Sequence, residues 1–276
     1  KTIMPQISNK GLELPQSAIR KLVPFSDAAK QRGIHVYHLN IGQPDIETPK
    51  GALKTLAETE VGVLAYSHSA GNLSYRKKLV EYYKRNNINI TPEQIIVTNG
   101  GSEALQFAFT VCLNPGDEII IPEPYYTNYN TFAKLCDATI KTIPSDIRGG
   151  FALPPIEDFE KAITPRTRAI MICNPNNPTG YLYTKEELLK VAEIVKKYDL
   201  FLFADEVYRE FCYDGHEHFS VMQLEGLENN VVLFDSVSKR YSACGARIGC
   251  MVTKNEEVYS IAMRLAQARL SPPSFG

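Results

Sequence analysis

The sequence predicts an α/β fold in which a mostly parallel sheet lies between helices. Short apolar runs recur along the chain, longer amphipathic segments separate them, and most runs end at a polar residue or turn former. Runs this apolar are typical of strands buried on both faces of a parallel sheet. The expected strands, in chain order, are 95–97, 119–121, 169–173, 200–204 and 231–234.

Apolar residues at helical spacing predict the helices that connect these strands. One is expected over residues 104–112, directly after a Gly-Gly turn, and another over 185–198. The first part of the chain is rich in loop formers, with one amphipathic helix expected over 19–29. We interpret residues 1–45 as an N-terminal arm plus part of a small domain, and 46–276 as a large domain.

Composition narrows the classes of partner. The net charge is -1, so no electrostatic footprint indicates nucleic acid or an anionic membrane. No apolar stretch approaches the roughly 20 residues of a membrane span, and no signal-peptide pattern begins the chain. The six cysteines form no C-x-x-C pair, and no ligand cluster surrounds His216 and His218. We expect a cytoplasmic protein with free thiols, no metal site, and no nucleic-acid or membrane partner.

Polar residues follow several of the expected strands. In open α/β sheets, ligands bind beyond the carboxyl ends of the strands, so these residues are candidates for chemistry. The glycines of Gly100-Gly101 allow a ligand to approach the backbone, and the following helix N-terminus offers N–H groups to an anion. Asp205 closes a very apolar run, which is costly unless the carboxylate has a cationic partner. Each signal is weak on its own.

Four motifs together resemble those of the class I/II aminotransferases of fold type I, which bind pyridoxal 5′-phosphate. They are N-P-N-N-P-T-G at 174–180, D-E-V-Y at 205–208, S-V-S-K at 236–239 and G-A-R-I-G at 245–249. The resemblance covers nearly the whole chain and includes N-I-G-Q-P-D at 40–45 and P-Y-Y at 124–126. The sequence around the S-V-S-K motif is similar to that of bacterial aspartate aminotransferases.

The resemblance implies a homodimeric enzyme with shared active sites. Its large domain contains the sheet, and a small α/β domain is incomplete in this chain. The implied reaction moves the amino group of an L-amino acid, aspartate favoured, to a 2-oxo acid such as 2-oxoglutarate.

The resemblance also implies a role for individual residues in catalysis. Lys239 forms a Schiff base with the cofactor and then acts as general acid and base. Asp205 pairs with the pyridine nitrogen and keeps it protonated, so that the ring accepts electrons. Asn177 and Tyr208 hydrogen-bond the phenolic oxygen of the cofactor, and Tyr125 stacks on its ring.

Further residues are implied in binding the phosphate and the substrate. The phosphate group is expected to contact Gly101, Ser102, Ser236, Ser238 and Arg247. The arginine suits this place because a guanidinium binds phosphate oxygens bidentately.

Three residues are implied at the edge of the site. Tyr66 is expected to reach the cofactor phosphate of the neighbouring subunit. Gly42, together with Asn177, is expected to line the position of the substrate carboxylate.

The chain departs from the family pattern in three ways. Ala246 stands where tryptophan is frequent, and Arg240-Tyr241 follows the lysine where small or apolar residues are frequent; both changes are expected to border the site. Relatives continue for roughly another hundred residues, which supply the arginine that binds the substrate α-carboxylate. We therefore expect the chain to be a fragment that binds the cofactor but transaminates little.

Two other functions stay open. A carbon–sulfur lyase or decarboxylase of the same fold uses the same lysine, aspartate and arginine, because a fold does not fix a reaction. An aminotransferase-like sensor domain of a transcription regulator is the second, although no basic helix-turn-helix pattern precedes the domain here.

Overall fold

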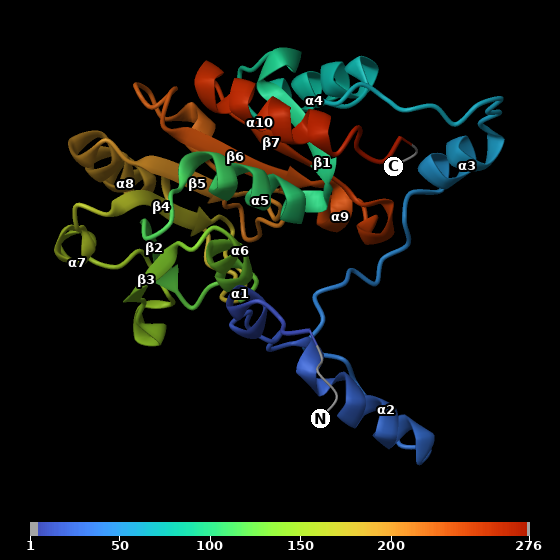
Figure 1. The fold of residues 1–276 in the computed structure, drawn as a ribbon, viewed down its shortest axis with the longest axis horizontal. Helices are drawn as coiled ribbons and strands as arrows, with labels where there is room; N and C mark the ends of the chain where they lie inside the picture. The colour runs from blue at the N-terminus through green and yellow to red at the C-terminus, as the bar shows by residue number, and fades with distance from the viewer. Residues whose placement is uncertain (1–4, 275–276) are drawn as a thin grey trace.

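The computed structural model describes residues 5–274 and contains a seven-stranded sheet in the order β1-β7-β6-β5-β4-β2-β3 (Figure 1). The pairs β2–β3, β2–β4, β4–β5 and β5–β6 are parallel, whereas β7 is antiparallel to both β1 and β6. The strands are β1 (Ile95–Asn99), β2 (Glu118–Glu123), β3 (Thr139–Pro144), β4 (Thr167–Cys173), β5 (Phe201–Asp205), β6 (Val231–Ser236) and β7 (Ile248–Val252). The predicted mostly parallel sheet is confirmed.

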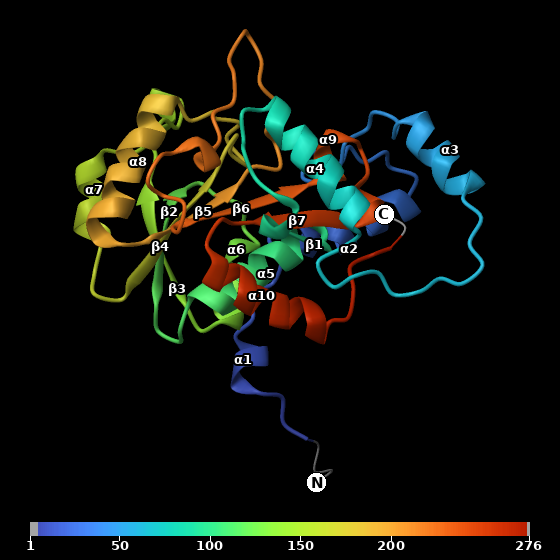
Figure 2. The same cartoon turned by 90° about the horizontal axis from the view of Figure 1, so that it is seen from above.

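Helices cover both faces of the sheet (Figure 2). One face packs against α4 (Leu73–Arg85), α7 (Ile156–Ala162) and α8 (Lys185–Tyr198). The other face packs against α5 (Gly100–Cys112), α6 (Tyr129–Leu135) and α10 (Glu256–Ala268). Successive strand residues alternate between the two cores, as side chains of a strand must: Ile170 and Ile172 join the first, and Met171 the second.

Sequence patterns predicted five of these strands but neither β3 nor β7. The first is an edge strand whose six residues are mostly exposed or half-buried, so its sequence T-I-K-T-I-P contains no continuous apolar run. The second, I-G-C-M-V, is fully buried but contains Gly249, and glycine weakens a strand pattern. The helices expected over 104–112 and 185–198 are confirmed as α5 and α8.

The N-terminal region lies apart from the packed body (Figure 1, Figure 2). None of residues 5–69 is buried. The region contains α1 (Asn9–Leu12), α2 (Val23–Gln31) and α3 (Lys50–Glu58), and α2 confirms the helix expected around 19–29. It touches the body at few points, such as the hydrogen bond from Thr48 Oγ1 to the Ser242 carbonyl at 2.7 Å. The boundary between arm and large domain at residues 45 and 46 stays a prediction.

Several short elements complete the described chain. The one-turn helix α9 (Val237–Arg240) follows β6 directly. The 3-10 turns are η1 (Arg20–Leu22), η2 (Pro92–Gln94), η3 (Ile147–Gly149), η4 (Val221–Gln223) and η5 (Cys244–Ala246). No helix within residues 5–274 combines the length and apolarity needed to cross a membrane.

Candidate functional site

The predicted site segments meet at one end of the sheet, beyond the carboxyl ends of its parallel strands. The parallel strands β4, β5 and β6 end there, and each is followed by one of the predicted motifs. Because β7 runs in the opposite direction, its first residues lie at this same end of the sheet, with Ile248 paired to Asn99 and Gly249 paired to Ser236. Arg247, which immediately precedes β7, is thereby placed between the ends of β1 and β6.

Two glycines allow β7 to lie directly against the N-terminus of α5. A Cβ atom on Gly249 would lie 2.4 Å from the carbonyl carbon of Gly100 and 2.6 Å from the nitrogen of Gly101. Gly100 has a φ of +68°, and a Cβ there would lie 2.2 Å from Nη2 of Arg247. A side chain at either position would displace the arginine or the helix.

Arg247 and two serines, Ser236 and Ser238, form a corner at this end of the sheet. Nη1 of Arg247 donates to the Cys244 carbonyl at 3.0 Å. The hydroxyl oxygens of Ser236 and Ser238 lie 2.7 Å apart, and Ser236 Oγ donates to the Ile248 carbonyl at 2.9 Å. The first N–H groups of α5 have no partner within the helix, and its dipole favours negative charge. The corner therefore has the properties of an anion site.

Asp205 is a buried carboxyl that lacks a cationic partner. It is the last residue of β5 and is 6% exposed. Its Oδ2 accepts a hydrogen bond from the Tyr129 hydroxyl at 2.8 Å, and its Oδ1 accepts one from the Val207 N–H at 3.3 Å. Burial raises the pKa of Asp205 to about 6, although the Tyr129 bond opposes it. Within residues 5–274 the carboxylate forms no ion pair.

Lys239 shares a cavity with three other predicted site residues. Its Nζ donates to the Gly42 carbonyl at 2.6 Å. Nδ2 of Asn177 donates to the Tyr208 hydroxyl oxygen at 3.3 Å, and burial raises the pKa of Tyr208, so the phenol stays protonated at neutral pH. The cavity has a volume of about 440 Å³. Its remaining lining residues are Gln43, Pro44, Asp45, Ile46, Pro175, Asn176, Pro178, Gly180, Phe211 and Tyr213.

Two adjacent tyrosines, Tyr125 and Tyr126, contact the ring of Tyr129 in different orientations. The ring of Tyr125, the predicted stacking residue, lies nearly parallel to that of Tyr129, at a centroid distance of 6.2 Å and an angle of 8°. Tyr126 meets the same ring edge-on at 5.4 Å. Burial raises the pKa of the Tyr126 phenol, as does the charge of Asp205, while Arg247 acts in the opposite direction. Tyr126 therefore contacts the same Tyr129 ring whose hydroxyl binds Asp205.

A buried ionic cluster lies behind Lys239 and was not predicted from the sequence. Nη2 of Arg240 donates to both carboxylate oxygens of Asp235, each at 2.7 Å. Arg209 donates to Asp235 at 3.3 Å and to Glu206 at 2.7 Å. The side chain of Arg240 is 6% exposed and does not line the cavity, although the residue directly follows Lys239; the expectation that it borders the site stays a prediction.

The sequence contained signals for some of these unpredicted residues. Asp235 closes an apolar run as Asp205 does, and the two strands are neighbours in the sheet. Tyr126 belongs to the P-Y-Y segment that was noted in the sequence, and Tyr129 follows it by three residues at the start of α6. No local signal indicates that Arg240 turns inward while the preceding lysine turns outward.

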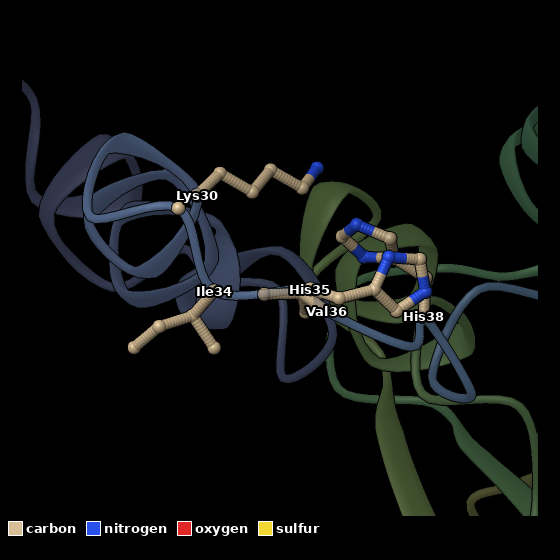
Figure 3. A pocket seen from close by; sticks show the side chains of 6 residues that line it. Lys30, Ile34, His35, Val36 and His38 are labelled. Carbon is tan, nitrogen blue, oxygen red and sulfur yellow. The ribbon is translucent and has the colours of Figure 1, made fainter.

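Some features lie away from the cavity. Tyr66 is 78% exposed, and its side chain makes no hydrogen bond within residues 5–274. A second hollow, of about 370 Å³, is lined by arm residues from Lys30 to His38 and by no predicted site residue (Figure 3). Across the described part of the chain, no group of three or more His, Cys, Asp or Glu side chains is arranged to hold a metal ion.

Relatives of the chain share its fold. It is 35% identical over 251 residues to the aspartate aminotransferase of Bacillus subtilis, which covers 89% of this chain and 63% of that protein. The structure of the Thermus thermophilus aspartate aminotransferase with maleate matches at a TM-score of 0.89 and 31% identity, covering 99% of this chain and 71% of that one. The alanine aminotransferase from Pyrococcus furiosus matches at a TM-score of 0.88 and 34% identity, covering 98% and 70%.

These comparisons confirm the expected fold class. The chain spans about two thirds or less of the length of the curated relatives it matches. A sequence model described as aminotransferase class I and II matches residues 34–276. With that match over most of its length, the chain belongs to the class I and II aminotransferase family.

Proposed function

We propose that this protein is a pyridoxal 5′-phosphate-dependent aminotransferase in which Lys239 binds the cofactor covalently. The observation that carries the proposal is the arrangement of side chains beyond the carboxyl ends of the parallel strands. Lys239, Asn177 and Tyr208 share one cavity, and the β5 strand beside it ends in Asp205, a buried carboxyl without a cationic partner. A covalent amine, a phenol donor and an uncompensated buried carboxylate are the groups that this cofactor requires.

The residues present fit the cofactor at both of its charged ends. The corner formed by Arg247, Ser236, Ser238 and the N-terminus of α5 would hold the phosphate, because it offers a guanidinium, two hydroxyls, of which Ser236 Oγ would turn from the Ile248 carbonyl, and the N–H groups of Gly101 and Ser102. The absence of side chains at Gly100 and Gly249 supports this assignment. Asp205 would hold the protonated pyridine nitrogen, which supplies the positive charge that the fold itself does not.

Asp205 has a quantitative role in this arrangement. When bound, pyridoxal phosphate supplies an electron sink for negative charge that develops at the substrate Cα. A carboxylate about 4 Å from the ring nitrogen contributes roughly 4 kcal/mol at an effective dielectric constant near 20, or about three pKa units before desolvation is subtracted. Asp205 would thus keep the nitrogen protonated at neutral pH, which a neutral side chain would not do.

Three residues would act on the reacting atoms. Lys239 would hold the cofactor through Nζ and, once the substrate amino group displaces it, move a proton between the substrate Cα and the cofactor C4′. Tyr208 and Asn177 would donate hydrogen bonds to the phenolic oxygen; their own bond of 3.3 Å places both groups together. Tyr125 is the proposed stacking residue, and Tyr126 is a second candidate because its ring contacts that of Tyr129, the tyrosine that binds Asp205.

The proposed substrates are an L-amino acid, with aspartate favoured, and a 2-oxo acid such as 2-oxoglutarate. Support for aspartate comes from relatives that are named aspartate aminotransferases. A similar structure is named alanine aminotransferase, so a panel of amino donors is needed. Gly42 and Asn177, which line the cavity beside Lys239, would face the substrate carboxylate.

A homodimer with shared active sites is part of the proposal. Tyr66 is 78% exposed, as is expected of a side chain that reaches a neighbouring subunit. A monomeric mass for the cofactor-bound protein in light scattering would contradict this part.

The test of the proposed function uses borohydride, which reduces an imine between a lysine and the cofactor to a stable bond. After reduction, the mass of the wild-type protein should increase by one cofactor minus the water lost on imine formation plus two hydrogens, and peptide mapping should place the increase at Lys239. Lys239→Ala should lose the labelled peptide and at least about 10²-fold of the transamination rate, which is the contribution of a general acid–base group. Lys185→Ala, which changes a lysine that lies over the Phe219 ring, is the matched control and should behave as wild type.

Two results would contradict the proposal. Labelling that persists in Lys239→Ala would remove the lysine from its assigned role. Release of ammonia or a thiol from an amino acid without any 2-oxo acid would favour a lyase instead of an aminotransferase.

A further inference from the structure

The helix that carries Lys239 is too short to fix its own position. α9 spans Val237–Arg240, four residues, and only one turn of backbone hydrogen bonds holds it, such as Tyr241 N–H to the Val237 carbonyl at 3.1 Å. Helix formation is unfavourable until several turns are in place, so a single turn has no stability of its own. Apart from the bond of its own Nζ to the Gly42 carbonyl, the direction of the Lys239 side chain therefore depends on what the other side chains of α9 bind.

Arg240 ties this turn to the end of β6. Its guanidinium donates to both oxygens of Asp235 at 2.7 Å, and the two side chains are 6% and 2% exposed. Asp235 belongs to β6, whose backbone is fixed by strands on both sides. The ion pair closes a segment of six residues, and Ser236, Ser238 and Lys239 all lie inside it.

Further contacts hold the ion pair from the other side. The Arg240 guanidinium lies 4.0 Å from the ring centroid of Tyr82 in α4, a distance at which the cation is attracted to the ring face. Asp235 also accepts a hydrogen bond from the Tyr83 hydroxyl at 2.9 Å and one from Arg209 at 3.3 Å. Arg240 is therefore held by a strand through Asp235 and by a helix through Tyr82, and its Nε lies 3.8 Å from Oε1 of Glu210 in a neighbouring loop.

Stability alone does not account for this arrangement. Burying two charges is costly, and replacing a buried ion pair with apolar side chains of similar volume is often neutral or stabilising. A charged pair with two short bonds differs from an apolar contact in that it specifies direction as well as proximity. The element whose direction is specified here is the turn that presents Lys239.

We propose that Arg240 is a positioning residue for Lys239: its ion pair with Asp235 fixes α9 on the end of β6 and thereby sets the direction of the lysine in the cavity. This inference rests on the proposed function, because it concerns the orientation of the cofactor lysine. Arg240 is not catalytic, since it contacts neither the cavity nor the lysine amine.

The test compares Arg240→Met and Arg240→Lys with Tyr83→Phe in the cofactor-bound protein. Tyr83→Phe is the matched control because it removes a bond to Asp235 without touching α9. Three quantities are measured: circular dichroism of the bound cofactor relative to its absorbance, which reports a fixed orientation; kcat and KM for the amino donor; and the urea midpoint of unfolding.

Arg240→Met should lose most of the visible circular dichroism and about 100-fold in kcat, since a misplacement near 1 Å has that effect, with little change in KM. Arg240→Lys keeps the charge but not the paired donors, so it should show a smaller loss of the same kind. Tyr83→Phe should lower the urea midpoint and leave both the dichroism and kcat as in wild type.

Two results would overturn the inference. The first is wild-type dichroism and kcat in both Arg240 variants; the second is a parallel loss in Tyr83→Phe, which would make the cluster merely structural. If Arg240→Met does not fold, Arg240→Lys decides between these results by the same measurements. Failure of the proposed function is distinguishable, because the wild-type protein would then carry no borohydride-fixed cofactor at Lys239.

Discussion

Two aspartates at the ends of neighbouring strands differ in how the fold treats their charge. Asp205 ends β5, and Asp235 lies one residue before the end of β6; both are buried, at 6% and 1% exposure. Each accepts a hydrogen bond from a buried tyrosine, Tyr129 at 2.8 Å for the first and Tyr83 at 2.9 Å for the second. In residue type, depth and tyrosine partner the two ends are alike.

They differ in their cationic partners. Burial alone would raise the pKa of Asp235, but the charges of Arg209 and Arg240 outweigh burial and hold that pKa below its usual value. Asp205 has no such partner, and burial raises its pKa to about 6. The fold thus neutralises one carboxylate with its own arginines, whereas within residues 5–274 it provides no cation for the other. This difference supports the proposed roles, a structural one for Asp235 and a cofactor-binding one for Asp205.

The largest expected effect concerns the arginine-paired carboxylate. Asp235→Asn should lower the free energy of unfolding of the cofactor-free protein by about 3–5 kcal/mol, because removing one partner of a buried ion pair leaves charge uncompensated. Urea denaturation followed by far-ultraviolet circular dichroism measures this loss. A loss below about 1 kcal/mol would mean that Arg209 and Arg240 find other partners, and the comparison would fail.

At Asp205 we expect the opposite change in stability: replacing this carboxyl should stabilise the protein. The folded protein holds the Asp205 proton up to about pH 6, whereas the unfolded chain releases it near pH 3.8, so wild-type stability falls between about pH 4 and pH 6. The difference of about two pKa units, at 1.36 kcal/mol each, is roughly 3 kcal/mol. Cofactor-free Asp205→Asn should therefore be more stable than wild type above pH 6, by up to that amount.

Urea titrations of both proteins from pH 4 to pH 8 measure this second effect. The two stability curves should lie closest together at pH 4, within about 1 kcal/mol, because the unfolded wild-type carboxyl is then close to half protonated. Asp205→Asn should also bind pyridoxal phosphate more weakly, because it lacks the charge that the pyridinium needs. Equal stability of the two proteins at pH 8 would show that Asp205 already has a cationic partner.

The smallest effect compares the two tyrosines. Tyr129→Phe and Tyr83→Phe each remove one hydrogen bond to a buried carboxyl, and each should lower stability at pH 8 by roughly 1.5–3 kcal/mol. Only Tyr129→Phe should also move the Asp205 stability window to higher pH, because Asp205 then keeps only the Val207 N–H as donor. A similar shift in Tyr83→Phe would indicate that the two carboxylates are not independent.

Much of the fold could be predicted because its signals are local. Five strands are continuous apolar runs, and α5 and α8 have helical apolar spacing, so neighbouring residues alone indicate them. β3 escaped because an edge strand is half-exposed, and β7 because Gly249 interrupts its pattern. That glycine is required by a contact with the helix that begins at Gly100, which no local pattern contains.

The sequence predicted the segments that form the candidate site but not the buried residues that hold those segments in place. Lys239, Asn177, Tyr208 and Gly42 were named from motifs, and the structure brings all four to one cavity. Their assigned roles stay predictions. Tyr129, which binds Asp205 across 76 positions of sequence, was not found, since no periodicity links residues so far apart.

The sequence by itself determined the class of fold, the candidate site residues at the strand ends and the family. These depend on residue type and short spacing. The tertiary structure alone decided that β7 runs antiparallel and so brings Arg247 to the site, and which of two similar aspartates receives arginines. The physical reason is that charge compensation depends on distance in space: Tyr83 reaches Asp235 from 152 positions away, while Arg240 does so from 5.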